Sequence, residues 1–353
     1  MSRNRPLVFS LLVLALLLPA VVVAQQPTTK TFYLTLRTRV DAPMRMMGMP
    51  DIQIPGMPTG EPQRSVIGRA LYEEAAVEPI FVMVPEDLQL ADSRLVLRLP
   101  APVTAEDGEG EGTEETPGKS PNIEMSNKLY WHPDEARGPV TETFTVEGGQ
   151  GPAGGMGMGM AMPDLSRIVQ EMNNREAEGS EVVKPKTVVG QGDYVLNTTG
   201  TATLDGFLPP LKMISPDMSQ LAPAEGIAVE WEPITGARGY LVSAVGTNMG
   251  GDEDNMKMTI TSWYSTINEP PMRIRGGYQQ ATTIADDLRD GVLLPGDTTS
   301  CVIPAGIFDD VMMLTITVEA IGNDFYSNEG GTTVFGTIRS EWSAMGMIMA
   351  MGG

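Results

Sequence analysis

The sequence predicts a mostly β protein, in which antiparallel β regions are followed by a C-terminal β-sandwich. Short runs rich in Val, Leu, Thr and aromatic residues alternate apolar and polar side chains, as half-buried strands do. Gly and Pro turns separate these runs, and no series of helices alternates with them, which favours a sandwich over an α/β fold. We expect one or two short helices and disordered linkers in addition.

The first residues of the chain have the order of a secretory signal peptide. Arg3 and Arg5 precede an apolar run that ends in small residues at Ala24. We therefore expect cleavage before Gln25 and a mature protein in the periplasm or outside the cell. An uncleaved anchor is the alternative, because the apolar run is nearly long enough to span a bilayer. No second apolar stretch of that length follows, so we expect no integral membrane segment after cleavage.

Composition divides the rest of the chain. Dense Glu and Gly in residues 101–122 leave nothing to build a core and predict disorder. In chain order we expect a signal peptide at residues 1–24, an irregular N-terminal β region at 25–100, an acidic disordered linker at 101–122, a middle β region at 123–214 with a Met/Gly-rich loop at 149–163 and a short helix at 163–178, the sandwich at 215–345, and a Met/Gly-rich tail at 346–353.

The sandwich is the most readable part of the chain. Strand-like runs occupy residues 227–231, 240–245, 258–264, 301–303, 313–320 and 333–342, and a short amphipathic segment at 283–289 predicts a helix between two of them. We expect Trp231 to lie in the core, near Tyr240 and Cys301.

Two resemblances accompany these patterns. The run Val229-Glu230-Trp231-Glu232-Pro233, with residues 236–240, resembles the second and third strands of fibronectin type III domains, in which the Trp is a core residue and the Tyr begins the next strand. Residues 318–322 and 340–343 resemble the last two strands of that family. Residues 267–299 depart from it, because they are longer than the usual connection there.

The whole chain also resembles a group of uncharacterised exported proteins of proteobacteria that carry Met/Gly-rich segments. The resemblance rests on the Met/Gly-rich segment after the first strand, on Leu129-Tyr130-Trp131, and on residues 226–240 and 294–308. That group usually has a Gly-Cys pair where this chain has His132-Pro133, so nothing that depends on that Cys is carried over. The resemblance implies an exported protein with no assigned activity.

Residue counts exclude several chemistries. A net charge of −21 opposes binding to nucleic acid. The single histidine, His132, and the single cysteine, Cys301, cannot build a tetrahedral zinc site. Nucleophile-elbow, zinc-protease and dinucleotide-binding motifs are missing from the sequence. We therefore predict a protein that is not an enzyme and needs no cofactor.

Methionine is the unusual residue, because 25 occur and many fall in three short segments. Met156, Met158, Met160 and Met162 alternate with glycine and other small residues, which would place four thioethers on one side of an extended chain. Thioethers are soft ligands suited to Cu(I) and Ag(I). A flexible loop with no metal is the alternative interpretation.

These observations predict an exported, non-catalytic protein of the cell envelope that binds an unknown protein partner or has a structural role. A methionine-based Cu(I)/Ag(I) binding protein is the first alternative. A hydrolase that uses paired carboxylates is the second. In so acidic a chain some carboxylates always lie close together, so their number does not favour it.

Overall fold

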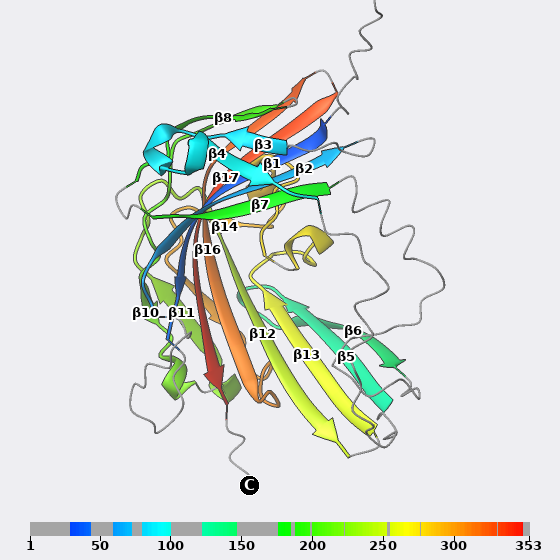
Figure 1. Cartoon of the computed structure of the whole chain (residues 1–353). Coiled ribbons are helices and arrows are strands. Elements are labelled where there is room, and N and C mark those ends of the chain that lie inside the picture. The colour runs from blue at the N-terminus through cyan, green and yellow to red at the C-terminus, as the bar shows by residue number, and fades with distance from the viewer. Residues whose placement is uncertain are drawn as a thin grey trace, which may run out of the picture.

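The structure, a computed structural model, describes residues 29–43, 59–72, 80–99, 122–146, 176–184, 188–197, 200–221, 223–252, 255–275, 277–329 and 331–348. It is mostly β, as the sequence predicts, and the described part contains one short α-helix (Figure 1).

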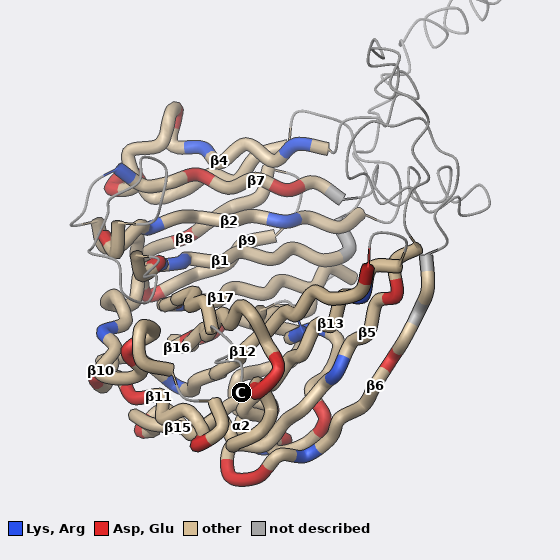
Figure 2. The backbone as a smooth tube through the Cα atoms, turned by 90° about the horizontal axis from the view of Figure 1, so that it is seen from below, with Lys and Arg blue, Asp and Glu red and all other residues tan. Residues whose placement is uncertain are grey.

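One large, strongly curved sheet forms the body of the molecule. It has ten strands, nine of them in the order β6-β5-β13-β12-β16-β17-β1-β2-β7, with β14 paired to β12. Figure 2 shows the strands of this sheet side by side, from β7 at one edge to β6 at the other. Its strands are β1 (Thr29–Asp41), β2 (Gln63–Tyr72), β5 (Asn122–Trp131), β6 (Arg137–Val146), β7 (Glu176–Val183), β12 (Gly239–Gly251), β13 (Asn255–Tyr264), β14 (Leu294–Pro295), β16 (Met313–Glu329) and β17 (Thr332–Met347).

Two small sheets cover the inner face of the large one. The first has the order β10-β11-β15 and the second the order β4-β3-β8-β9. Their strands are β3 (Ile80–Met83), β4 (Arg94–Leu97), β8 (Gly192–Leu196), β9 (Thr201–Leu204), β10 (Met213–Ser215), β11 (Ile227–Trp231) and β15 (Ser300–Ile303). The helices are α2 (Ile284–Arg289) and the single 3₁₀ turns η1 (Glu86–Leu88), η2 (Ala91–Ser93), η4 (Met218–Gln220), η5 (Pro223–Glu225) and η6 (Met272–Ile274).

A continuous apolar core lies between the large sheet and both small sheets. Alternate residues of each strand supply it, which explains the period of two in the sequence. Trp231 on β11 is 1% exposed, and its ring centroid lies 5.1 Å from that of Tyr240 on β12. Cys301 on β15 is also buried and pairs with Val229, two residues before Trp231. The expected burial of Trp231 near Tyr240 and Cys301 is therefore observed.

The outer face of the large sheet is covered in part by the connection between β13 and β14, residues 265–293. A second, smaller apolar cluster holds this connection against β12 and β16, and it includes Leu241, Tyr278 and Ile321. Thr283 caps α2 by accepting a hydrogen bond from the backbone N–H of Asp286. The short helix expected at residues 283–289 is confirmed. Residues 267–293, most of the stretch expected to be unusually long, belong to this cover of the outer face.

Strands from all three expected β regions hydrogen-bond within the one large sheet. β1 pairs in parallel with β17, and β5 pairs in parallel with β13. The expected boundaries after residues 100 and 214 therefore do not separate one sheet from another, because pairing between distant strands cannot be read from local periodicity.

Two local expectations require correction. Residues 176–178, expected at the end of a helix, lie in β7, where cross-strand pairing to β2 fixes an extended backbone. Residues 346 and 347, assigned to a Met/Gly-rich tail, complete β17 and pair with β16. The expected signal peptide, the acidic linker up to residue 121 and the Met/Gly-rich loop lie outside the described residues.

Candidate functional site

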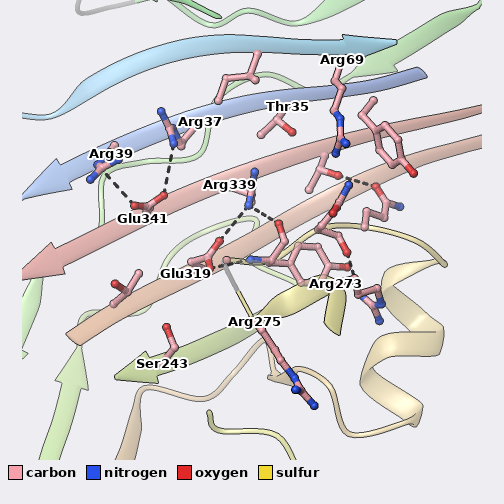
Figure 3. A pocket seen from close by; sticks show the side chains of 18 of the residues that line it. Thr35, Arg37, Arg39, Arg69, Ser243, Arg273, Arg275, Glu319, Arg339 and Glu341 are labelled. Carbon is pink, nitrogen blue, oxygen red and sulfur yellow. Dashed lines mark hydrogen bonds and ion pairs between the residues drawn. The ribbon is translucent and has the colours of Figure 1, made fainter. Parts of the chain in front are cut away.

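A pocket with a volume of about 670 Å³ lies between the outer face of the large sheet and the covering connection. Strands β1, β2, β12, β16 and β17 form its floor, and residues 272–280 form its other wall. Its lining contains six arginines and two glutamates, although the chain as a whole is strongly acidic. The arginines are Arg37, Arg39, Arg69, Arg273, Arg275 and Arg339, and they reach the pocket from both the sheet and the connection (Figure 3).

Two of these arginines are directly opposite each other. Arg37 on β1 is the register partner of Arg339 on β17. Like charges in such positions destabilise a sheet. Both side chains are largely buried, and the Nε of each is buried without a hydrogen-bond partner among the described residues. Burial lowers the pKa of Arg37. The nearby Arg39 and Arg339 lower it further, whereas Glu341 and Asp41 raise it. The sheet therefore places two arginines side by side, each with one buried N–H that no described residue accepts.

Two glutamates of β16 and β17 form ion pairs with arginines of the pocket. Glu319 and Glu341 are themselves register partners on β16 and β17. Glu319 lies 3.1 Å from Arg339, whereas Glu341 lies 3.9 Å from Arg37 and 3.6 Å from Arg39. Burial raises the pKa of Glu341, and the nearby Glu319 raises it further. Arg37 and Arg339 thus each have one carboxylate within 4 Å. Arg39 and Arg275 form further ion pairs with Asp41 and Glu269. What remains unsatisfied among the described residues is the Nε of Arg37 and of Arg339.

The connection is tied to the floor of the pocket through the backbone of Tyr278. Its N–H donates to Glu319 Oε1 at 3.0 Å, and its carbonyl oxygen accepts from Arg339. Gln280 is held in the same way, because its side chain accepts from Thr337 at 2.6 Å and donates to Asp324 at 3.0 Å. These bonds fix the connection over the sheet and leave a defined space beside it.

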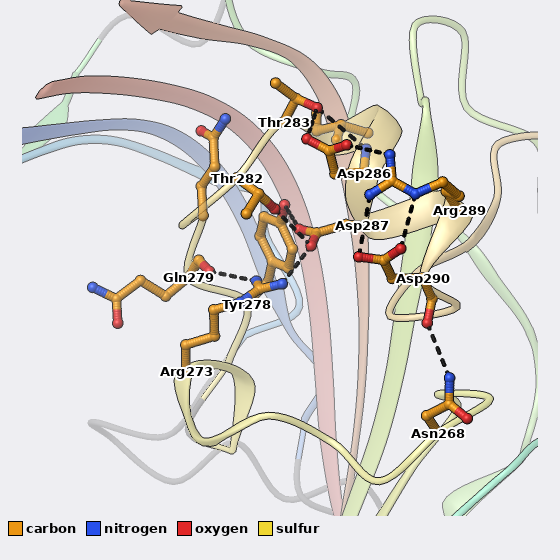
Figure 4. A network of polar contacts seen from close by, with 12 residues as sticks. Asn268, Arg273, Tyr278, Gln279, Thr282, Thr283, Asp286, Asp287, Arg289 and Asp290 are labelled. Carbon is orange, nitrogen blue, oxygen red and sulfur yellow. Dashed lines mark hydrogen bonds and ion pairs between the residues drawn. The ribbon is translucent and has the colours of Figure 1, made fainter. Parts of the chain in front are cut away.

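Asp287 of α2 anchors the connection from the other side (Figure 4). Its carboxylate is almost completely buried and accepts hydrogen bonds from the Tyr278 hydroxyl at 2.6 Å and from Thr282 at 3.0 Å. It also forms an ion pair with Arg273. Burial, and then the bond to Asp287, raises the pKa of Tyr278, so this phenol stays protonated.

This arrangement offers an anion several positively charged hydrogen-bond donors. Guanidinium groups recognise carboxylate, phosphate and sulfate through paired hydrogen bonds. The volume falls in the range of small-molecule sites. Tyr264 also lines the pocket, and burial raises its pKa to about 12, so it carries no charge near neutral pH. The lining includes neither histidine nor cysteine.

The sequence did not single out any of these pocket residues. Met156, Met158, Met160 and Met162, its candidate metal ligands, lie outside the described residues. Within the described ranges, no group of three or more His, Cys, Asp and Glu side chains is arranged to hold a metal ion. His132 lies in the turn between β5 and β6, where its carbonyl oxygen accepts from the Trp263 indole.

A signal for the pocket was nevertheless present in the sequence. In residues 31–40, Phe32, Leu34 and Leu36 alternate with polar residues that end in Arg37 and Arg39. Period-two alternation places both arginines on the face opposite the core. The pairing with β17, which brings Arg339 beside them, was not visible locally.

The described part of the chain has no helix that is both long enough and apolar enough to cross a membrane. Comparison of the chain with protein-family models, with curated proteins and with solved structures found no match.

Proposed function

We propose that this chain is an exported, non-catalytic binding protein of the cell envelope, and that its ligand is a small molecule with more than one acidic group. The observation that carries the proposal is the pair Arg37 and Arg339, held opposite each other, each with a buried Nε that has no partner among the described residues, in a pocket lined by six arginines and two glutamates. An oxyanion bridging such a pair would relieve their repulsion and accept hydrogen bonds from both. The sequence alone favoured a protein partner or a structural role, and the pocket now supports a smaller ligand.

Anion binding should appear as a rise in thermal stability. A ligand that binds only the folded state stabilises it by about 2.7 kcal/mol at one hundred times its dissociation constant. We expect citrate and sulfate to raise the melting temperature of the mature protein above that in chloride of equal ionic strength. The variants Arg37→Gln and Arg37→Gln/Arg69→Gln should lose most of this rise, because both arginines line the pocket.

Arg64→Gln is the matched control. Arg64 is a partly buried arginine of β2 that donates to the carbonyl of Val188 and lies over the Phe207 ring, outside the pocket lining. Its replacement should leave the effect of citrate intact. An equal response in all variants, or no response of the wild type to any of these anions, would contradict the proposal.

The hydrolase alternative rests on one observation, that the carboxylates of Glu319 and Glu341 lie on neighbouring strands in the pocket. A glycosidase needs two carboxylates on either side of the bond that it cleaves. Here both oxygens of Glu319 are already engaged, one by the Tyr278 N–H and the other by Arg339. Glu319 is also nearly inaccessible. These contacts favour a charge-balancing role over a catalytic one.

Glu341→Gln separates the two functions. In a binding site it removes a charge that competes with the ligand, so affinity for sulfate should increase. Because burial raises the pKa of Glu341, this carboxyl takes up a proton at a higher pH than an exposed glutamate does. Sulfate affinity of the wild type should therefore rise as the pH falls from neutral to mildly acidic, and the variant should lack this rise. In a carboxylate-dependent hydrolase the same change would abolish activity instead.

Export is a separate part of the proposal. The apolar run and the small residues up to Ala24 support cleavage there. N-terminal sequencing of the protein purified from the cell envelope should begin at Gln25. Material that still begins at Met1 would favour the uncleaved anchor.

A further inference from the structure

Methionine side chains line up across three neighbouring strands of the large sheet. Met249 on β12 is the register partner of Met258 on β13, and Met258 is the register partner of Met125 on β5. Residues paired in this way point to the same face, with Cβ atoms about 4.5–5.5 Å apart. Met125, Met249 and Met258 are here called the methionine row. Methionines of three neighbouring strands therefore lie side by side on one face, with Met125 far from the other two in the sequence.

The methionine row lies on the outer face, beyond the arginine pocket. Val245 and Tyr264 line that pocket, and Met249 and Met258 follow on the same regular strands at an even number of residues from them. Val245 and Met249 are four residues apart, which corresponds to about 13 Å along a strand. The row and the pocket are therefore two separate places on one face.

Further methionines continue this surface. Met256 precedes Met258 by two residues and so shares its face. Met313 and Met347 are register partners on β16 and β17 and lie on the face of Glu319 and Glu341. Met249 is 56% exposed and Met347 is 43% exposed. Single exposed apolar residues are common on proteins, so the alignment of Met125, Met249 and Met258, rather than exposure, is the observation that carries the inference.

The donor set indicates what this surface would bind. Thioether sulfur is neutral and soft, and it selects Cu(I) and Ag(I) over hard cations such as Ca²⁺ and Mg²⁺. The backbone is fixed by pairing on both sides at Met125 and Met258, and by pairing with β13 at Met249. Such a frame holds ligands better than a loop does. Met258 occupies the middle strand, so the two outer side chains can lean toward it from either side.

We propose that the methionine row binds one soft monovalent cation, Cu(I) or Ag(I), through the sulfur atoms of Met125, Met249 and Met258. Met256 lies beside them as a neighbouring donor. The site differs from the run at Met156 to Met162, because its ligands come from strands rather than from one short segment. It is also independent of anion binding in the arginine pocket.

The test is a titration of the full-length mature protein with Ag(I) in chloride-free buffer, observed through ¹³C-labelled methionine methyl groups. The methyl signals of the three row methionines should shift together and saturate at one Ag(I) per chain. The variant Met125→Leu/Met249→Leu/Met258→Leu should lose this complex. Leucine has nearly the volume of methionine, so the fold should be retained. Should the triple variant fail to fold, Met258→Leu alone removes the central donor.

Two comparisons decide the outcome. Met83→Leu/Met312→Leu removes two exposed methionines outside the row and should bind Ag(I) like the wild type. Arg37→Gln should do so too, which keeps this result separate from that for the pocket. Loss of the complex only on replacement of Met156, Met158, Met160 and Met162 would overturn the proposal. So would row methyl signals that do not move, since the row would then be an apolar surface without metal.

Discussion

Trp231→Ala should lower the free energy of unfolding by about 3–5 kcal/mol, as the truncation of a large core side chain does. Trp231 is 1% exposed and packs against Tyr240 at the centre of the space between β11 and β12. Removing it opens a cavity that the two strands cannot close, because each is held by pairing within its own sheet. Denaturation in guanidinium chloride, compared with the wild type, measures the loss.

Two further substitutions isolate the cause. Trp231→Phe keeps a ring in the core and removes an indole N–H that is buried without a partner among the described residues, so its cost should be smaller. Val302→Ala changes an exposed position of β15 and should cost about 0.5 kcal/mol or less. A loss below about 1 kcal/mol for Trp231→Ala, the range of surface sites, would refute its core position.

Cys301 offers a local readout of the same event. Burial raises the pKa of its thiol to about 12, so the folded protein should resist thiol reagents at mildly alkaline pH. Labelling of Cys301 therefore reports opening of the β10-β11-β15 layer, and Trp231→Ala should accelerate it.

Asp287→Ala should also cost about 3–5 kcal/mol, because it leaves one partner of a buried ion pair without its counter-charge. Arg273 would lose its carboxylate, and the Tyr278 and Thr282 hydroxyls would lose their acceptor. Since Tyr278 ties the connection to Glu319 and Arg339, the wall of the arginine pocket should loosen as well. Thermal unfolding and citrate binding, measured on the same sample, follow both effects.

Asp286→Ala is the matched control on the same helix. Asp286 is partly exposed and bonds only locally, to Thr283 and Arg289, among the described residues. Its replacement should change neither citrate binding nor stability by a comparable amount. If both variants behave alike, Asp287 is not the anchor of the connection.

Local patterns in the sequence predicted most strands and the one described α-helix. Alternation in residues 31–40 and 227–231, and the Thr283 cap, are properties of a few neighbouring residues and depend little on the rest of the chain. The predicted helix at 163–178 ended inside β7, because pairing with β2 overrides a weak local preference.

The two candidate sites could not be predicted in the same way. The arginine pocket depends on the register of Arg37 with Arg339, and the methionine row on the register of Met258 with Met125 and Met249. The pairs Arg37–Arg339 and Met125–Met258 join strands that are distant in the chain, whereas Met249 and Met258 belong to consecutive strands. Composition drew attention to methionines in glycine-rich segments. The methionines of the row lie instead on three separate strands, where no local cluster marks them.

The parallel pairing of β1 with β17 also has a consequence for the order in which the protein folds. Phe32 and Val334 are register partners, so the first described strand meets its neighbour only when the last strand is present. Contacts between such distant residues slow folding, because a very long loop must close before they form. During synthesis β1 could pair with β2, but its other side would stay unpaired until β17 has been made. Release of a chain cut short before β17 should therefore yield an aggregation-prone protein rather than a smaller stable one.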